Sequence, residues 1–89
     1  MNLTGLSSKS DKMEVKVFFF GGLAEITGEG CIRVPEVRDT DELIARLQVQ
    51  YQALSQTRYR VVVNNRMIQE NTSLDQQAEV ALLPPFSGG

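Results

Sequence analysis

Apolar residues alternate with other residues near the start of the chain, in the run EVKVFFF over residues 14–20. A period of two is typical of a β-strand, whose successive side chains point to opposite faces of a sheet. The pattern therefore predicts a strand that buries Val15, Val17 and Phe19 on one face. Two more aromatic residues, Phe18 and Phe20, fall on the other face, where a small single domain exposes them.

The residues that follow predict the return of a hairpin with a long loop. Gly21-Gly22 ends the first strand, residues 23–26 are expected to form a helical turn, and residues 27–30 (TGEG) are turn material. Residues 31–34 (CIRV) predict a short second strand that Pro35 closes. Cys31 stands among apolar residues, so we interpret it as a small hydrophobic side chain and not as a reactive thiol.

After residue 38 the apolar period becomes that of a helix. Apolar side chains recur on one helical stripe, at Leu43, Leu47, Tyr51 and Leu54. Asp39 or Thr40 is expected to cap this helix, with Glu42 at the capping-box distance from Asp39. Capping and the helix dipole, and not catalysis, therefore explain the acidic start of the helix.

Three strands are expected after the helix: residues 59–63 (YRVVV) as a buried strand, residues 66–68 as a short return strand, and residues 79–83 (EVALL) as the last strand. Asn64-Asn65 is turn chemistry that tolerates positive φ, and residues 71–75 suggest a turn or a short 3₁₀ segment. This order of elements predicts an α+β protein. The fold expected is a β-grasp (ubiquitin-like) roll, with a mixed sheet of four to five strands packed on one main α-helix.

The chain ends in Pro84-Pro85-Phe86-Ser87-Gly88-Gly89, which carries the strongest indication of function. Prolines cannot donate to a sheet and hold the chain extended, so six residues reach roughly 20 Å from the domain. Glycine has no Cβ and fits channels too narrow for other residues. We therefore expect a flexible extension (1–12), a β-grasp domain (13–83) and an extended functional tail (84–89) whose terminal carboxylate reacts. An inert, disordered terminus is the alternative for a bare Gly-Gly ending.

Composition removes several classes of function. The net charge of −2 gives no footprint for nucleic acid, and the absence of histidine removes the usual general base and metal ligand. One cysteine excludes an internal disulfide and a multi-cysteine zinc site. No apolar run approaches a membrane span and no signal peptide is visible, so we expect a cytoplasmic protein that contacts no membrane. We also expect that Arg58, Arg60 and Arg66, around the third strand, are solvated; the alternative is that they meet an acidic partner.

Taken together, these segments resemble the molybdopterin synthase small subunits, a family of ubiquitin-like sulfur carriers. The resemblance covers about residues 13–89 and is most specific at the ending EVALLPPFSGG of residues 79–89. It also rests on residues 15–20 followed by 23–28, on the helix start at 41–47, and on Val63-Asn64. Two departures are Asp75-Gln-Gln-Ala78, where the family usually has a Gly-Asp pair, and Phe86, where valine is more frequent.

The resemblance implies a sulfur-donating subunit of a sulfurtransferase that is not catalytic alone. It implies that a partner adenylating enzyme uses ATP to activate Gly89, and that a donor such as a cysteine desulfurase or rhodanese supplies sulfur to form a thiocarboxylate. The large subunit of molybdopterin synthase then accepts the tail, and sulfur passes to cyclic pyranopterin monophosphate in molybdenum cofactor biosynthesis. In this reading the tail inserts into the large subunit together with Gly89; the inserted residues are Pro84, Pro85, Phe86, Ser87 and Gly88. Two residues outside the tail, Phe18 and Phe20, dock the partner. The chain itself is expected to hold no metal and no tightly bound cofactor.

Three alternatives stay open at this point. A ubiquitin-like modifier uses the same terminal glycine to form isopeptide bonds with target lysines. A sulfur carrier for thiamine or another metabolite is the second, although the Pro-Pro pair weighs against thiamine. The third is a plain β-grasp binding domain with an inert tail, which would tolerate loss of Gly89.

Overall fold

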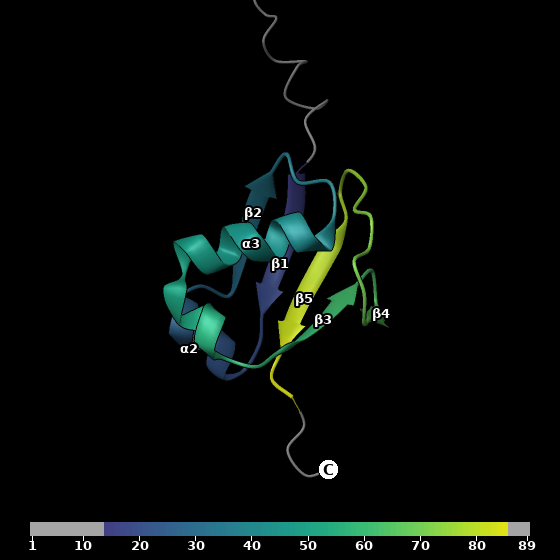
Figure 1. Cartoon of the computed structure of the whole chain (residues 1–89). Helices are drawn as coiled ribbons and strands as arrows, with labels where there is room; N and C mark the ends of the chain where they lie inside the picture. The colour runs from purple at the N-terminus through teal and green to yellow at the C-terminus, as the bar shows by residue number, and fades with distance from the viewer. Residues whose placement is uncertain (1–13, 86–89) are drawn as a thin grey trace, which may run out of the picture.

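The computed structural model describes residues 14–85, which form five strands and three helical segments. In chain order these are β1 (Glu14–Phe19), α2 (Gly22–Thr27), β2 (Cys31–Pro35), α3 (Thr40–Gln50), the 3₁₀ helix η2 (Gln52–Gln56), β3 (Arg60–Val63), β4 (Arg66–Ile68) and β5 (Glu79–Leu83). The strands form one sheet in the order β2-β1-β5-β3-β4 (Figure 1). Only the neighbours β1 and β5 run parallel; the other pairs are antiparallel. The predicted mixed sheet and β-grasp roll are confirmed.

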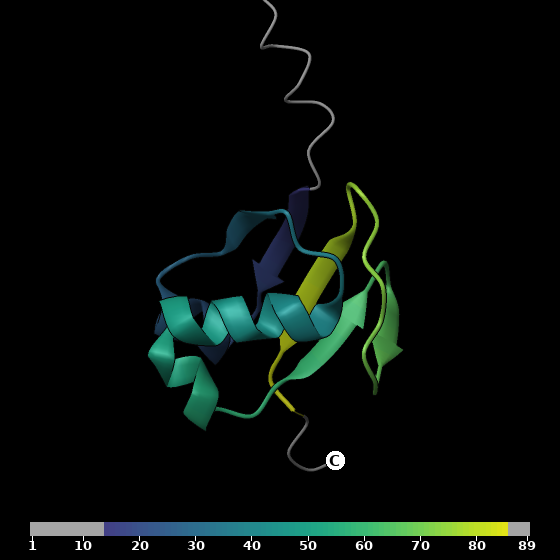
Figure 2. The same ribbon diagram turned by 45° about the horizontal axis from the view of Figure 1, so that its top comes forward.

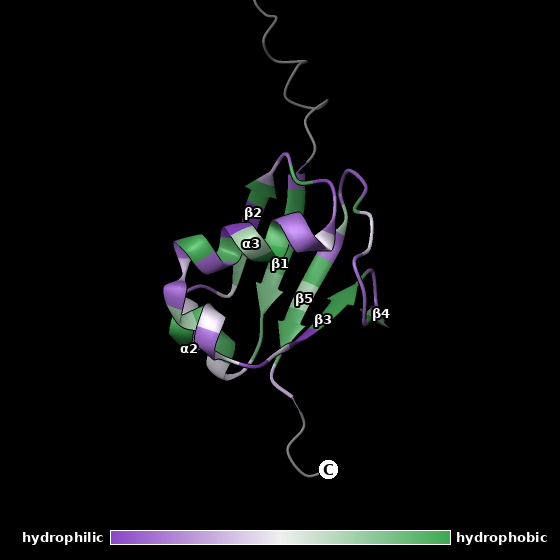
Figure 3. Ribbon diagram, in the orientation of Figure 1, coloured by the Kyte–Doolittle hydropathy of each residue, from purple (hydrophilic) through white to green (hydrophobic). Residues whose placement is uncertain are grey.

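Helix α3 crosses one face of the sheet, and η2 lies on the same side (Figures 1 and 2). Neither view shows a helix over the opposite face of the described sheet. The strand phase predicted for β1 is confirmed, because Val15, Val17 and Phe19 are buried beneath α3 and η2. Figure 3 shows hydrophobic residues concentrated in β1, β5 and β3, whereas α3 alternates between the two classes as an amphipathic helix does.

The core is a single cluster between the sheet and the helices. Its fully buried large side chains are Leu23, Leu43, Leu47, Leu54, Leu82, Val15, Val17, Val37 and Val80. At one end the ring of Phe19 meets Tyr51 edge to face, with centroids 5.8 Å apart and ring planes at 74°. The central strands β1 and β5 therefore supply the floor on which α3 and η2 rest.

The start of α3 is capped as predicted, with one difference. Asp39 is the N-cap, and its Oδ1 accepts a hydrogen bond of 2.9 Å from the Glu42 amide. The Glu42 carboxylate accepts a hydrogen bond from the amide of Arg38, one residue before the N-cap. In a capping box it would accept instead from the amide of the N-cap residue, Asp39. The Asp39 side chain still satisfies the Glu42 amide, so the acidic start of the helix is structural.

The apolar stripe of this segment spans two elements. The α-helix ends at Gln50, and Leu54 reaches the core from the 3₁₀ helix that follows. Tyr51 makes the last α-type bond, donating its amide to the Leu47 carbonyl at 2.7 Å. The tighter 3₁₀ winding keeps Leu54 buried while it redirects the chain toward β3.

The segment before β5 differs from the prediction of a turn or 3₁₀ segment at residues 71–75. It runs without helical structure beside the start of α3, and Ser73 forms an isolated antiparallel bridge with Asp39. The side-chain oxygen of Asn71 accepts from the Asp41 amide at 2.9 Å and from the Thr40 hydroxyl at 3.2 Å. Long-range bonds to the helix start therefore replace the local bonds of a turn.

The remaining connections follow the sequence more closely. Asn64 and Asn65 have φ of 49° and 71°, the positive values expected of the two-residue turn between β3 and β4. Strand β3 is less buried than predicted, since only Val63 of its four residues is fully buried. The reason is that Val62 faces the uncovered side of the sheet, as described below.

Candidate functional site: the uncovered sheet face and the start of the tail

An apolar row crosses the uncovered face of the sheet, with one residue from each strand. Phe18 is the register partner of both Cys31 on β2 and Ala81 on β5. Ala81 is in turn the partner of Val62, and Val62 that of Met67 on β4. Cross-strand partners project from the same face of a sheet, so these five side chains are neighbours. We call them the apolar row.

The side chains of this face are accessible. Phe20 is 46% exposed and Met67 is 49% exposed, whereas Phe18 is half-buried. Phe18, Phe20, Val62 and Ala81 line a shallow hollow of 220 Å³. The prediction that Phe18 and Phe20 lie opposite the core is confirmed. An exposed apolar surface of this kind is typical of a protein docking site.

The tail begins at the edge of this surface. Phe20 lies just beyond β1, and its amide donates to the Leu82 carbonyl at 3.1 Å, which extends the parallel ladder. Its neighbour across that ladder is therefore Leu83, the last residue of β5. Because β5 lies between β1 and β3, the chain leaves the sheet from its middle and not from an edge.

Pro84 ends β5 as predicted, since proline has no amide hydrogen for the ladder. Pro84 and Pro85 are exposed. The other predicted tail residues, Phe86, Ser87, Gly88 and Gly89, lie outside the described residues, and so their roles stay predictions.

One contact at the start of the tail escapes sequence reasoning. Gly21 has φ 60° and ψ −138°, and a Cβ built on it would lie 2.9 Å from Cγ of Pro84. Sequence analysis treats Gly21-Gly22 only as the break after the first strand. The contact depends on the parallel pairing of β1 with β5, which no local pattern reveals.

The charged and sulfur-containing side chains of the region are exposed. Arg58, Arg60 and Arg66 are all exposed, as expected for solvated arginines, and Nη1 of Arg60 lies 3.4 Å from Sδ of Met67. Cys31 has apolar neighbours, as its strand indicated, and its side chain is exposed at one end of the apolar row. A partner covering this face therefore meets an apolar centre with arginine at its border.

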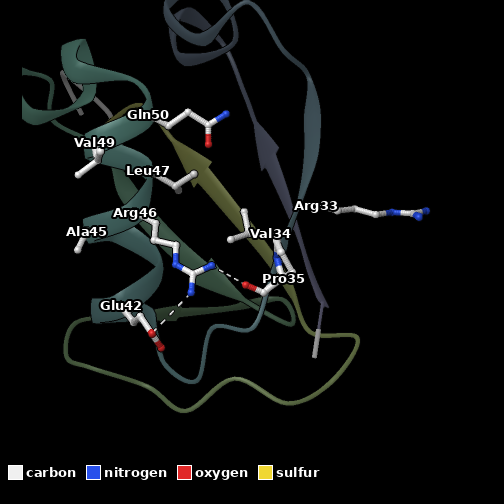
Figure 4. A pocket seen from close by; sticks show the side chains of 9 residues that line it. All are labelled: Arg33, Val34, Pro35, Glu42, Ala45, Arg46, Leu47, Val49 and Gln50. Atoms are coloured by element: carbon white, nitrogen blue, oxygen red, sulfur yellow. Dashed lines mark hydrogen bonds and ion pairs between the residues drawn. The ribbon is translucent and has the colours of Figure 1, made fainter. Parts of the chain in front are cut away.

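A second surface feature is the groove of 580 Å³ between α3 and β2 (Figure 4). Arg46 crosses it and donates to the carbonyls of Pro35 and Glu36, with its Nη2 3.8 Å from Oε2 of Glu42. These bonds tie the helix to the end of β2. The lining is largely apolar, and its one carboxylate, that of Glu42, lies beside the Arg46 guanidinium.

Residues 14–85 contain no group of three or more histidine, cysteine, aspartate or glutamate side chains placed to hold a metal ion. None of the helices in this range has the length and apolar character that a membrane span requires. The features that remain for function are thus the uncovered face and the tail that starts beside it.

Comparison with known proteins gives relatives over nearly the whole chain. The molybdopterin synthase sulfur carrier subunit of Arabidopsis thaliana is 26% identical over 87 residues, which cover 93% of this chain and 91% of that protein. One chain in the structure of the complex of subunits 1 and 2 of the Helicobacter pylori molybdopterin-converting factor is 30% identical. That match has a TM-score of 0.66 and covers 86% of this chain and 100% of that one.

Small archaeal modifier proteins have the same fold. The crystal structure of small archaeal modifier protein 1 from Haloferax volcanii aligns with a TM-score of 0.72 and 25% identity, over 85% of this chain and 99% of that one. A family model described as the ThiS family matches residues 17–89, which include every strand of the sheet except the first residues of β1. The chain therefore belongs to the ThiS family of ubiquitin-like β-grasp proteins.

Proposed function

We propose that this chain is the sulfur-carrier small subunit of a molybdopterin synthase, with Gly89 as the residue that carries sulfur. The observation that supports this most is the position of the tail. It starts at Leu83-Pro84, in the middle of the sheet, directly beside an uncovered apolar face. Relatives named as a molybdopterin synthase sulfur carrier subunit and as part of a molybdopterin-converting factor support this assignment over a general binding role.

The first step of the proposed reaction activates the carboxylate. A carboxylate is a poor electrophile because its charge is delocalised and oxide is a poor leaving group. One carboxylate oxygen of Gly89 attacks the α-phosphorus of ATP, pyrophosphate leaves, and the product is an acyl-adenylate. The partner adenylating enzyme supplies the ATP site, since residues 14–85 contain neither a G-x-x-x-x-G-K-[ST] nor a G-x-G-x-x-G phosphate-binding motif.

The second step exchanges oxygen for sulfur. The terminal sulfur of a donor persulfide, on a cysteine desulfurase or rhodanese, attacks the carbonyl carbon of Gly89 and displaces AMP. A second thiol then reduces the resulting acyl disulfide, so the donor is oxidised to a disulfide and Gly89 is left as a thiocarboxylate. The thiocarboxylate is ionised at neutral pH, and its sulfur is a strong, polarisable nucleophile, as thiolates are.

The last step transfers the sulfur to cyclic pyranopterin monophosphate in the active site of the large subunit. The sulfur of Gly89 attacks a carbon of the pterin side chain that carries oxygen, and that oxygen leaves, as water or through opening of the cyclic phosphate ester. Water then hydrolyses the remaining bond between the sulfur and the Gly89 carbonyl, which restores the carboxylate and leaves the sulfur on the pterin. A dithiolene needs two sulfur atoms, so two charged tails are consumed for each product. Every acid, base and metal ligand in this scheme belongs to a partner.

Docking through the uncovered face explains how the partner selects this tail. Phe18 and Phe20 provide apolar area that a partner buries, and Pro84-Pro85 reduce the conformational entropy lost when the tail inserts. The H. pylori relative is described in complex with a second subunit, which supports a large subunit as the partner here. Specificity then comes from the face and reactivity from the tail.

Reconstitution tests the proposal directly. Thiocarboxylated protein and the large subunit from the same organism are incubated with cyclic pyranopterin monophosphate, and molybdopterin is measured by fluorescence after oxidation. Product should form in proportion to the thiocarboxylate supplied, at one molecule for each two tails. The unmodified carboxylate form is the matched control, and equal product from both forms refutes the proposal.

A ubiquitin-like modifier is the second candidate, because small archaeal modifier protein 1 of H. volcanii shares the fold at 25% identity. It uses the same acyl-adenylate, but a target lysine amine attacks the carbonyl carbon and forms an isopeptide bond. Species of higher mass that carry Gly89 linked to lysine, seen after tryptic digestion of a cell extract, would favour the modifier.

A further inference from the structure

The start of the tail rests on a single turn of the domain. A Cβ added at Gly21 would lie 2.9 Å from Cγ and 3.5 Å from Cδ of Pro84, and Cβ contacts under 3.0 Å essentially do not occur in proteins. The pyrrolidine ring is closed on its own backbone nitrogen, so its Cγ can move only by the small shift between the two ring puckers. A side chain at position 21 that exceeds this shift pushes on the backbone at Pro84.

The backbone of the turn at Gly21 is also held in place, so it cannot easily move away from Pro84. Phe20, before Gly21, is bonded to the last strand through its amide and the Leu82 carbonyl at 3.1 Å. The Gly21 carbonyl accepts from the amide of Ala24 at 3.1 Å, which opens α2. With φ 60° and ψ −138°, Gly21 also occupies a backbone region that essentially only glycine adopts. Hydrogen bonds thus fix the turn on both sides of Gly21, and Pro84 lies against Gly21, which has no side chain.

We propose that Gly21 is a positioning residue for the tail, because the space it leaves for Pro84 sets the direction in which the chain leaves the sheet at Pro84-Pro85. This inference rests on the proposed function, since it concerns delivery of the Gly89 carboxylate to a partner's active site. A chain of five residues reaches at most roughly 17 Å, so a rotation of about 10° at Pro84 moves a group at that distance by about 3 Å. Reacting groups need to lie within about 3–3.5 Å of each other, so this displacement is large.

The contact predicts a particular kinetic effect. Gly21 carries no side chain that contributes to docking, so a redirected tail should leave the KM for adenylation unchanged and lower kcat. A misplacement of 1 Å costs on the order of 100-fold in rate, and the partner's channel guides the tail back in part. We therefore expect Gly21→Ala to reduce kcat by about tenfold or more.

Two glycines of the same chain are matched controls. Gly28 also has a positive φ, 76°, and a Cβ added there meets nothing within 4 Å. Gly22 adjoins Gly21, and a Cβ there also meets nothing within 4 Å. Gly28→Ala thus introduces an alanine with positive φ but no contact with the tail. Gly22→Ala introduces a methyl group beside the turn, with neither a positive φ nor a contact with the tail.

The test measures kcat and KM of ATP-dependent adenylation, as pyrophosphate release with the cognate adenylating enzyme, in a double-mutant cycle with Pro84→Ala. Alanine at position 84 lacks the two ring atoms that lie on Gly21, so Gly21→Ala should lower kcat about tenfold in wild type and less than twofold in the Pro84→Ala background. KM and the two glycine controls should stay within twofold of wild type. An equal loss of kcat in both backgrounds means strain in the turn alone, and it overturns the inference.

Further outcomes separate this inference from the function on which it rests. Wild-type protein that no adenylating enzyme of its host activates refutes the proposed function and the positioning role together. Wild type that is activated, with Gly21→Ala as fast as Gly28→Ala, refutes the positioning role alone. If Gly21→Ala does not fold by circular dichroism, Pro84→Ala makes the comparison from the other side of the contact. It should then lower kcat more than Pro85→Ala does, and equal rates for these two variants overturn the inference.

Discussion

Replacing Phe20 by alanine should weaken partner docking by an amount that the structure fixes. The residue is 46% exposed, and a phenylalanine has roughly 200 Å² to bury, so about 90 Å² is available to a partner. At about 25 cal/mol per Å², loss of that contact costs about 2 kcal/mol, or about 30-fold in Kd. The buried remainder of the ring contributes to folding, so the variant is also less stable, and binding has to be measured where both proteins are folded.

The assay is isothermal titration of the large subunit with wild type, Phe20→Ala and Val49→Ala, at a temperature where circular dichroism shows all three folded. Val49 is 78% exposed on α3, on the side of the sheet away from Phe20, so its loss should leave Kd unchanged. A Kd for Phe20→Ala within twofold of wild type would show that the uncovered face does not dock the partner. Equal weakening by both variants would point to a general loss of structure instead.

Four further predictions concern the tail and the fold. Gly88→Val should block adenylation or tail insertion with an unchanged circular dichroism spectrum, and deletion of Gly89 should abolish sulfur transfer; normal transfer by Gly88→Val would refute the narrow channel. Leu47→Ala removes a core side chain that is 1% exposed and should cost about 2–5 kcal/mol, seen as a fall in thermal midpoint of at least about 10 °C. Asp39→Ala removes the N-cap of α3 and should cost about 1 kcal/mol, or about 4–8 °C, against a smaller change for Asp41→Ala; equal midpoints for these two variants would argue against the cap.

The parts of the fold that sequence reasoning predicted correctly are those that depend on local chemistry. The alternation in β1 assigns Phe18 and Phe20 to the face opposite the core because a strand has a period of two. The Asn64-Asn65 turn follows from the tolerance of asparagine for positive φ. The cap at Asp39 follows from its side-chain oxygen and its place before the apolar stripe.

The features that sequence reasoning missed depend on partners distant in the chain. Asn71 looks like a turn residue, but its side chain accepts from the Asp41 amide once the loop lies beside α3. Leu54 continues the stripe of α3 from a 3₁₀ helix, since burial alone does not distinguish the two windings. The contact of Gly21 with Pro84 joins the first and last strands and exists only because these pair in parallel.

The candidate site likewise has one part that the sequence predicts and one part that depends on contacts distant in the chain. The proposed sulfur-carrying residue comes from the sequence alone, since the Gly88-Gly89 pair is read directly from it. Its setting is a matter of topology, because only the strand order places the start of the tail in the middle of the sheet, beside Phe20. The apolar row likewise needs all five strands in register, since each strand contributes a single residue to it.

The central claim is that Gly89 carries sulfur, and intact-mass spectrometry of the protein isolated from its native host, through an N-terminal tag, tests it most directly. The account predicts a species whose mass gain matches replacement of one oxygen by sulfur, located at Gly89 by fragmentation, and absent when Gly89 is deleted. The large subunit of molybdopterin synthase should co-purify with it. Protein recovered only as the free carboxylate, from cells that are making molybdenum cofactor, would contradict the claim.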